Sequence, residues 1–189
     1  LGGGSSDAGF FLKLLNEHYG NVYDEKELEE LAMKVGSDVP FFIKNKTARV
    51  GGKGNKVELV ENNLKDSLIL VKPLGFGVST KDAYNSFDEL DEVRYANFEK
   101  IVECLRNDNR KDLEKYIENG LEQGISERNA DIKMFKAILN SVVPGKKFFM
   151  SGSGSTYYTF VTEIERSQIE TRLRTFVDNV KIIISKTIN

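Results

Sequence analysis

The order of strands and helices in the second half of the chain constrains the fold most. Four stretches rich in apolar residues are typical of strands, 68–71, 148–150, 157–161 and 180–185, and the first of them is continuously apolar. Five stretches have the spacing of helices: 81–87, 93–106, 110–119, 129–140 and 163–176. Without the extra helices the order is strand, helix, strand, strand, helix, strand, which is that of a ferredoxin-like domain. The sequence therefore predicts an α+β fold here.

The first third of the chain predicts a smaller domain. Two helical stretches, 8–19 and 25–35, each end at a glycine. Three short strands are expected: 41–43, 47–50 and 57–60. Pro40 disfavours helical backbone at Val39, which supports the first of them. The polar stretch 61–66 is the best boundary, so we expect domains at 1–66 and 67–189.

Composition and charge exclude several classes of protein. The 27 Lys+Arg and 29 Asp+Glu give a formal net charge of −2, so the chain has no overall cationic field for nucleic acid or an anionic membrane. No apolar run approaches the ~20 residues of a membrane span. A lone Cys104 and a lone His18 exclude an internal disulfide and disfavour a zinc site. We expect a cytoplasmic protein, with both residues structural and any metal bound through oxygen.

The glycine-rich beginning of the chain is the first candidate for chemistry. The stretch 2–7 reads Gly-Gly-Gly-Ser-Ser-Asp and precedes a predicted helix. Consecutive glycines let the backbone approach a bulky anion, and the helix N-terminus offers partial positive charge. The hydroxyls of Ser5 and Ser6 can bond phosphate or Mg²⁺. No Gly-Lys-Ser/Thr follows, so this is not a Walker A loop. The alternative is a flexible linker ending in a helix cap.

Two further motifs lie at junctions between elements. Asp38 lies between Gly36 and Pro40, at the junction of a predicted helix and a predicted strand, and could take a proton from a hydroxyl. Its alternative role is that of a turn residue that accepts backbone N–H groups. The stretch 151–155 reads Ser-Gly-Ser-Gly-Ser between two predicted strands and is longer than a tight hairpin needs, which favours a functional loop.

These motifs, in this order, resemble those of the GHMP kinases. Those that carry the resemblance are Leu1-Gly2-Gly3-Gly4-Ser5-Ser6-Asp7-Ala8, Gly36-Ser37-Asp38-Val39-Pro40-Phe41-Phe42, Gly77-Val78-Ser79-Thr80 with Tyr84, Asn119-Gly120-Leu121-Glu122, and Met150 with Ser151-Gly152-Ser153-Gly154-Ser155. The resemblance implies the GHMP kinase fold, with the remainder of the N-terminal kinase domain at 1–66 and the C-terminal kinase domain at 67–189. The match is strongest to the branch that uses ATP and Mg²⁺ to phosphorylate a hydroxyl of 4-diphosphocytidyl-2-C-methyl-D-erythritol in non-mevalonate isoprenoid biosynthesis.

The resemblance also implies a role for individual residues. The ATP phosphates would be bound by Gly2, Gly3, Gly4, Ser5 and Ser6. Asp38 would be the base near the acceptor hydroxyl. The cytidine pocket would be lined by Thr80 and Tyr84, and the site would be closed by Gly152, Ser153 and Gly154. No residue is assigned as a metal ligand.

Two rival functions stay open at this point. One is a GHMP kinase with another acceptor, such as homoserine or mevalonate, and the other is a nucleotide-binding module without catalysis. The partner we expect is a small cytidine diphosphate conjugate, bound by a monomer or homodimer. Because the family begins with a stretch that carries a catalytic lysine, we expect a bacterial C-terminal portion that is inactive alone. Its strands at 41–60 would then lack their partners and leave open sheet edges.

Overall fold

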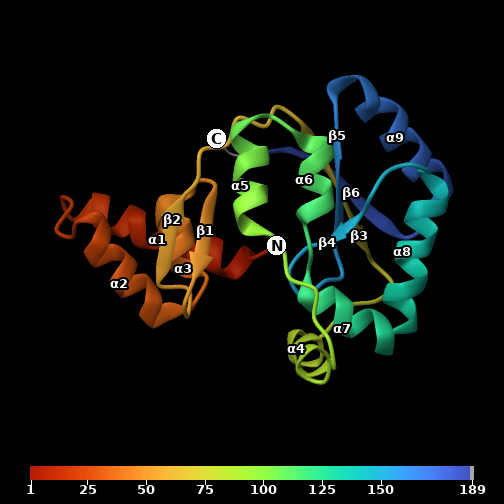
Figure 1. The fold of residues 1–189 in the computed structure, drawn as a ribbon. Coiled ribbons are helices and arrows are strands. Elements are labelled where there is room, and N and C mark those ends of the chain that lie inside the picture. Colours follow the sequence, from red (N-terminus) through yellow and green to blue (C-terminus); the bar gives the residue numbers. More distant parts are fainter. Residues whose placement is uncertain (188–189) are drawn as a thin grey trace. The chain divides into compact units, whose positions relative to one another are not determined.

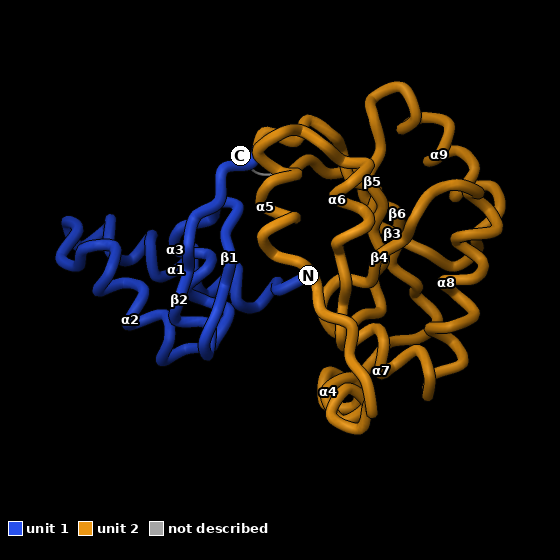
Figure 2. The backbone as a smooth tube through the Cα atoms, viewed as in Figure 1, with its two compact units in different colours: residues 1–62, 188–189 blue, residues 63–187 orange. Residues whose placement is uncertain are grey.

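A computed structural model describes residues 1–187 of the chain, and these form two compact units (Figure 1). Figure 2 shows them in different colours: residues 1–62 and residues 63–187. The division falls between Asn62 and Asn63, inside the polar stretch 61–66. The identity of the units as two kinase domains stays a prediction.

The first unit is three helices and one hairpin around a small core. Its elements are α1 Gly3–His18, α2 Glu25–Val35, α3 Val39–Lys44, β1 Ala48–Gly51 and β2 Lys56–Leu59. A capping box between Asp24 and Glu27 begins α2. The buried residues Leu28 and Ala32 of α2 pack against Val39 and Ile43 of α3. The core therefore lies where α2 and α3 meet.

The prediction of a strand at 41–43 in this unit is wrong. The stretch 41–43 is helical rather than a strand, because Pro40 occupies the first turn of α3, where its missing N–H costs no hydrogen bond. The strands β1 and β2 pair with each other in antiparallel register from Ala48↔Leu59 to Gly51↔Lys56, and within residues 1–187 the outer edge of each has no partner strand, as the prediction of open sheet edges requires. In addition, α1 begins at Gly3, five residues before the predicted start at 8, because the helix continues back through the glycines.

The second unit is built on a four-stranded antiparallel sheet. Its strands are β3 Ser67–Pro73, β4 Phe149–Met150, β5 Tyr157–Val161 and β6 Val180–Lys186. Their order in the sheet is β4-β5-β3-β6. The central strand β3 pairs Ile69 with Thr159 on one side and with Ile184 on the other. This connectivity confirms the α+β, ferredoxin-like prediction.

Six helices accompany this sheet. They are α4 Thr80–Asp88, α5 Phe98–Arg106, α6 Arg110–Tyr116, α7 Gly120–Arg128, α8 Ala130–Val142 and α9 Glu163–Phe176. The sequence does not predict α7, because two glycines in nine residues weaken its helical signal. The predicted helix at 93–106 is shorter, since α5 begins only at Phe98 with Asn97 as its cap.

Both faces of the sheet are covered by helices. The side chains of Ile69, Val71 and Tyr157 share a buried cluster with α8 and α9, whereas Phe149 and Phe160 share one with Cys104 of α5 and Leu113 of α6. Figure 1 shows α8 and α9 on one side of the sheet and α5 and α6 on the other. The structural role predicted for Cys104 is confirmed by its burial, which also raises the pKa of its thiol. Among residues 1–187 no helix is long and apolar enough to cross a membrane.

A charged network joins α6 and α9 of this unit. Arg110 Nη1 lies 3.2 Å from Asp66 Oδ1 and 3.1 Å from Glu165 Oε2, and Lys146 Nζ lies 2.8 Å from Glu165 Oε1. Burial raises the pKa of Glu165, but hydrogen bonds from Lys146, from the Thr162 backbone and from Arg110 outweigh it and hold the pKa at about 2. Burial raises the pKa of Asp66, and that effect exceeds the attraction of Arg110.

The lowered pKa of Glu165 predicts a loss of stability in acid. Its folded-state pKa lies below the ordinary value of 4.5, so its contribution is complete above pH 4.5 and is lost as the pH falls toward 2. We expect Glu165→Gln to remove part of the wild type's pH dependence in this window, as measured by urea unfolding at several pH values. Glu163→Gln is the control, since Glu163 has its ion pair with Arg166 of the same helix. Equal pH dependence of wild type and Glu165→Gln would contradict this account.

Candidate functional site

In the second unit, the start of α4 meets the glycine-rich turn of residues 151–155, called here the glycine turn. Ser79 caps α4, its Oγ accepting the Asp82 N–H at 3.4 Å. Thr80 follows, and its Oγ1 lies 3.2 Å from Ser153 Oγ across a sequence separation of 73 residues. Tyr84 lies one helical turn further on and is 54% exposed. The structure thus brings Thr80 to Ser153 and places Tyr84 on the same helix.

The glycine turn is held by its own backbone and by α7. The Ser151 N–H donates to Thr156 O at 2.9 Å, and the Gly154 N–H donates to Ser151 O at 3.0 Å. From α7, the amide of Asn119 donates to Met150 O at 2.8 Å and to Gly152 O at 2.9 Å. Sequence reasoning identifies Asn119 only as part of a family motif, and the 31 and 33 residues that separate it from its partners leave no local signal.

Helix α7 also fixes the position of α4. A Cβ at Gly124 would lie 2.6 Å from the carbonyl oxygen of Ser86 and 2.6 Å from the backbone nitrogen of Phe87. Only a glycine permits so close an approach of the two helix backbones. The same helix therefore supports both Thr80, through α4, and Ser153, through the glycine turn.

In the first unit, the predicted phosphate-binding residues form the N-terminus of α1. Gly2 is the N-cap, and the first helical hydrogen bond runs from Ser6 N–H to Gly2 O at 2.8 Å. The N–H groups of Gly3, Gly4 and Ser5 precede it and have no intrahelical acceptor. No side chain caps the helix, its first turn holds no acidic residue, and a Cβ at Gly3 or Gly4 would meet nothing within 4 Å. An anion could thus reach these N–H groups.

Asp38 lies directly before α3 with an exposed side chain. Although it is the N-cap residue by position, its carboxylate accepts no capping hydrogen bond. The backbone next to it is fixed by the turn between β1 and β2, since a Cβ at Gly54 would lie 1.9 Å from the carbonyl oxygen of Ser37. Sequence reasoning identifies a turn at 51–55 but misses this contact, for which three glycines in four residues are the only signal.

Within residues 1–187 no group of three or more His, Cys, Asp or Glu side chains is arranged to hold a metal. The oxygens that could contribute to a Mg²⁺ site near α1 are the hydroxyls of Ser5 and Ser6. Mg²⁺ commonly keeps several waters and binds substrate phosphates with one or two protein ligands, so such a donor set fits a metal that arrives with ATP.

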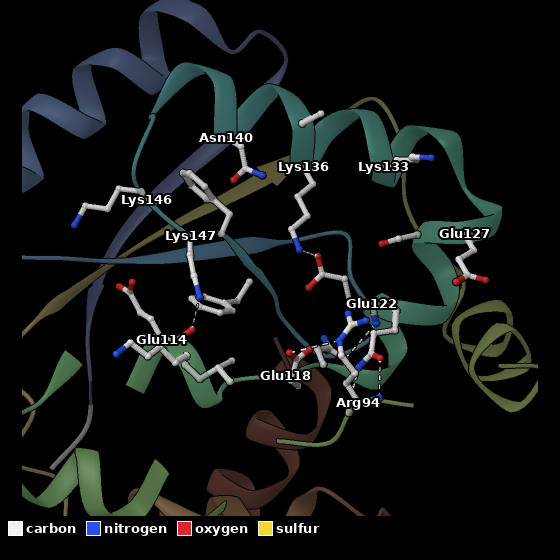
Figure 3. A pocket seen from close by; sticks show the side chains of 18 of the residues that line it. Arg94, Glu114, Glu118, Glu122, Glu127, Lys133, Lys136, Asn140, Lys146 and Lys147 are labelled. Atoms are coloured by element: carbon white, nitrogen blue, oxygen red, sulfur yellow. Dashed lines mark hydrogen bonds and ion pairs between the residues drawn. The ribbon is translucent and has the colours of Figure 1, made fainter. Parts of the chain in front are cut away.

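A separate cavity of about 870 Å³ lies in the second unit (Figure 3). It is lined by acidic and basic side chains from α6, α7, α8 and the segment that precedes β4. Lys136 points into it toward Glu122, with 2.6 Å between Nζ and Oε1. At one end Arg94 pairs with Glu118 at 3.7 Å. Thr80, Tyr84 and Ser153 are not among its lining residues. The cavity is therefore distinct from the predicted substrate residues.

Comparison with known proteins connects both units to one group. The GHMP kinases N terminal domain matches residues 1–46. A 4-diphosphocytidyl-2-C-methyl-D-erythritol kinase of Fusobacterium nucleatum is 78% identical over all 189 residues, which cover 64% of its length. The kinase of the same name from Clostridium botulinum is 33% identical over 175 residues, covering 89% of this chain and 60% of the relative. The chain thus spans less than two thirds of the length of these curated relatives.

A solved structure shows a similar fold. The crystal structure of a 4-(cytidine 5'-diphospho)-2C-methyl-D-erythritol kinase superimposes with a TM-score of 0.75 at 26% sequence identity. The match covers 98% of this chain and 66% of that one. It includes residues of both units, so the similarity extends beyond the family match at 1–46.

Proposed function

Because this chain belongs to the GHMP kinase family, we propose that its protein uses ATP to phosphorylate a hydroxyl of 4-diphosphocytidyl-2-C-methyl-D-erythritol. The observation that carries the proposal is the 78% identity, along the whole chain, to a kinase named for this substrate. The reaction belongs to non-mevalonate isoprenoid biosynthesis, and we place it in the bacterial cytoplasm. The activity is proposed for the protein in its natural length, of which this chain carries the residues below.

The N-terminus of α1 would bind the ATP phosphates. Support comes from the N–H groups of Gly3, Gly4 and Ser5, which have no intrahelical acceptor. No side chain caps the helix and its first turn holds no acidic residue, so the N-terminus favours an anion. The hydroxyls of Ser5 and Ser6 would add bonds to phosphate oxygens or to Mg²⁺. When bound with ATP, Mg²⁺ neutralises negative charge on the transferred phosphoryl group.

Asp38 would act on the acceptor hydroxyl. As the oxygen–phosphorus bond forms, the hydroxyl must lose its proton, and a nearby carboxylate can accept it. The Asp38 carboxylate is exposed and is not used to cap α3, so it is free to do so. This supports the base role over that of a turn residue.

The start of α4 and the glycine turn would bind the acceptor. Thr80 and Ser153 present their hydroxyls to each other at 3.2 Å, with Gly152 and Gly154 on either side of Ser153. The exposed ring of Tyr84 offers a face on which a cytosine can stack. Together these groups suit a ligand with one aromatic and one polar part.

The proposal is tested with the natural-length protein and three acceptors. ADP release is measured with ATP, Mg²⁺ and, in turn, the diphosphocytidyl substrate, homoserine and mevalonate. We expect turnover only with the first. Faster turnover of homoserine or mevalonate would show that the proposed acceptor is wrong. ATP binding without turnover of any acceptor would favour a nucleotide-binding module.

Tyr84→Ala is expected to weaken acceptor binding selectively. Loss of one stacked base costs about 1–3 kcal/mol, which corresponds to a rise of about 5- to 150-fold in the acceptor KM. Because Tyr84 is 54% exposed, the melting temperature and the KM for ATP should change little. Tyr95→Ala is the matched control, since Tyr95 lies in the same unit and is 78% exposed. An unchanged acceptor KM in the folded Tyr84→Ala protein would contradict the stacking role.

A further inference from the structure

We propose that Asn119 is a positioning residue whose amide holds the glycine turn in place and so sets Ser153 against Thr80. The proposal rests on the proposed function only in assigning the glycine turn to the acceptor site. The contact itself, 2.9 Å from Asn119 Nδ2 to Gly152 O, stands on the geometry of the second unit.

The Asn119 side chain has two separate tasks. Its Oδ1 caps α7 by accepting the N–H groups of Leu121 at 3.0 Å and Glu122 at 3.3 Å. Its Nδ2 uses both hydrogens on backbone carbonyls outside the helix, those of Met150 and Gly152. An N-cap needs only the oxygen. The nitrogen is therefore committed entirely to the start of the glycine turn.

Glu122 strengthens the same attachment from the first turn of α7. It is only 8% exposed, and its Oε2 accepts the Met150 N–H at 3.2 Å while Oε1 pairs with Lys136. Met150 is the last residue of β4, the edge strand of the sheet, and its outward N–H and C=O both bond to side chains of α7. These side chains take the place of a neighbouring strand at this edge.

The contacts form a closed path. From Asn119 the path runs to Gly152, then through Ser153 to Thr80 at the start of α4. Helix α4 packs against α7 at Gly124, five residues beyond Asn119. Because α4 is fixed on α7 by backbone contact, the separation of Thr80 from Ser153 depends on how firmly Asn119 holds the glycine turn.

The decisive variant is Asn119→Asp. Aspartate keeps the oxygen that caps α7 but replaces the nitrogen with an oxygen that faces two carbonyl oxygens. Both hydrogen bonds to these carbonyls are lost, and the negative carboxylate is placed against the partial negative charge of the two carbonyl oxygens. Asn129→Asp is the matched control, because Asn129 caps α8 through its Oδ1 and the Ile132 N–H at 3.0 Å, with no carbonyl partner within residues 1–187.

The experiment combines two measurements on the natural-length protein. Hydrogen exchange of the amides at 151–155 should become about 30-fold faster in Asn119→Asp, as expected for the loss of two hydrogen bonds that hold this turn, and should not change in Asn129→Asp. The acceptor KM should rise about tenfold, while the KM for ATP stays the same. A variant that was merely less stable would not separate the two KM values.

The outcomes distinguish the two proposals. Unchanged exchange at 151–155 in a folded Asn119→Asp protein overturns the positioning role. Faster exchange with an unchanged acceptor KM supports the positioning role and removes the glycine turn from the acceptor site. If Asn119→Asp does not fold, Asn119→Ser replaces it, because serine still caps a helix but is too short to reach the carbonyls. The exchange measurement then decides in the same way.

Discussion

Replacing Asp38 with Asn is expected to lower kcat of the natural-length protein by about 10²–10⁴-fold, the usual contribution of a general base. Asparagine keeps the shape of the side chain but cannot accept the proton of the acceptor hydroxyl. The melting temperature should not change, because the Asp38 carboxylate makes no capping hydrogen bond that the amide could lose. Steady-state kinetics and thermal unfolding of the same preparation measure both quantities.

Asp24→Asn is the matched control for this variant. Asp24 is the N-cap of α2, and its Oδ1 accepts the Glu27 N–H at 2.9 Å, a bond that asparagine can also make. Neither kcat nor the melting temperature should change in this control. If Asp38→Asn retained most of its kcat, or lost stability instead, Asp38 would be a turn residue and not the base.

The elements of the second unit were predictable where their pattern is long and regular. The stretch 163–176 has helical spacing and follows a capping box at Thr162, and it forms α9 at the predicted limits. Strand β5 forms at the predicted limits 157–161 and is buried at four of its five residues, and β6 ends one residue beyond the predicted limit at 185. With four strands in the right order, the ferredoxin-like topology follows from chain connectivity alone.

The first unit was harder because short apolar runs do not distinguish a strand from a helix. Phe41-Phe42-Ile43 has three adjacent apolar residues, which favours a strand. The structure instead buries Val39 and Ile43, four residues apart, on one face of α3 against Ala32. The deciding information is the partner helix α2, and that packing cannot be read from six residues.

The candidate site shows the same limit. Asp38 and the two glycine stretches can be selected from residue type and spacing, but the contacts that hold them depend on residues far away in the chain. Asn119 bonds to Gly152, which is 33 residues away in the sequence, and Gly54 in the hairpin turn lies against the backbone of Ser37. Such pairs are determined by the packing of whole elements, so a single sequence carries little signal for them.

Gly54→Ala should be among the most destabilising single substitutions in the first unit. The residue has φ of +93°, which disfavours any side chain, and an added Cβ would lie 1.9 Å from the Ser37 carbonyl oxygen. We expect a loss of about 3 kcal/mol in the free energy of unfolding, from about 1–2 kcal/mol of backbone strain and about 1–3 kcal/mol of overpacking. Hydrogen exchange of the amides in α1 and α2 measures the free energy of unfolding of this unit alone.

Gly20→Ala separates the two causes. Gly20 has nearly the same φ, +86°, but an added Cβ would meet nothing within 4 Å. It should therefore cost only the backbone strain of about 1–2 kcal/mol. Because the overlap at Gly54 pushes on the peptide that precedes Asp38, Gly54→Ala should also lower kcat in the fraction that remains folded, whereas Gly20→Ala should not. Equal destabilisation by both variants, with equal kcat, would show that the hairpin turn does not fix the backbone at Ser37 and Asp38.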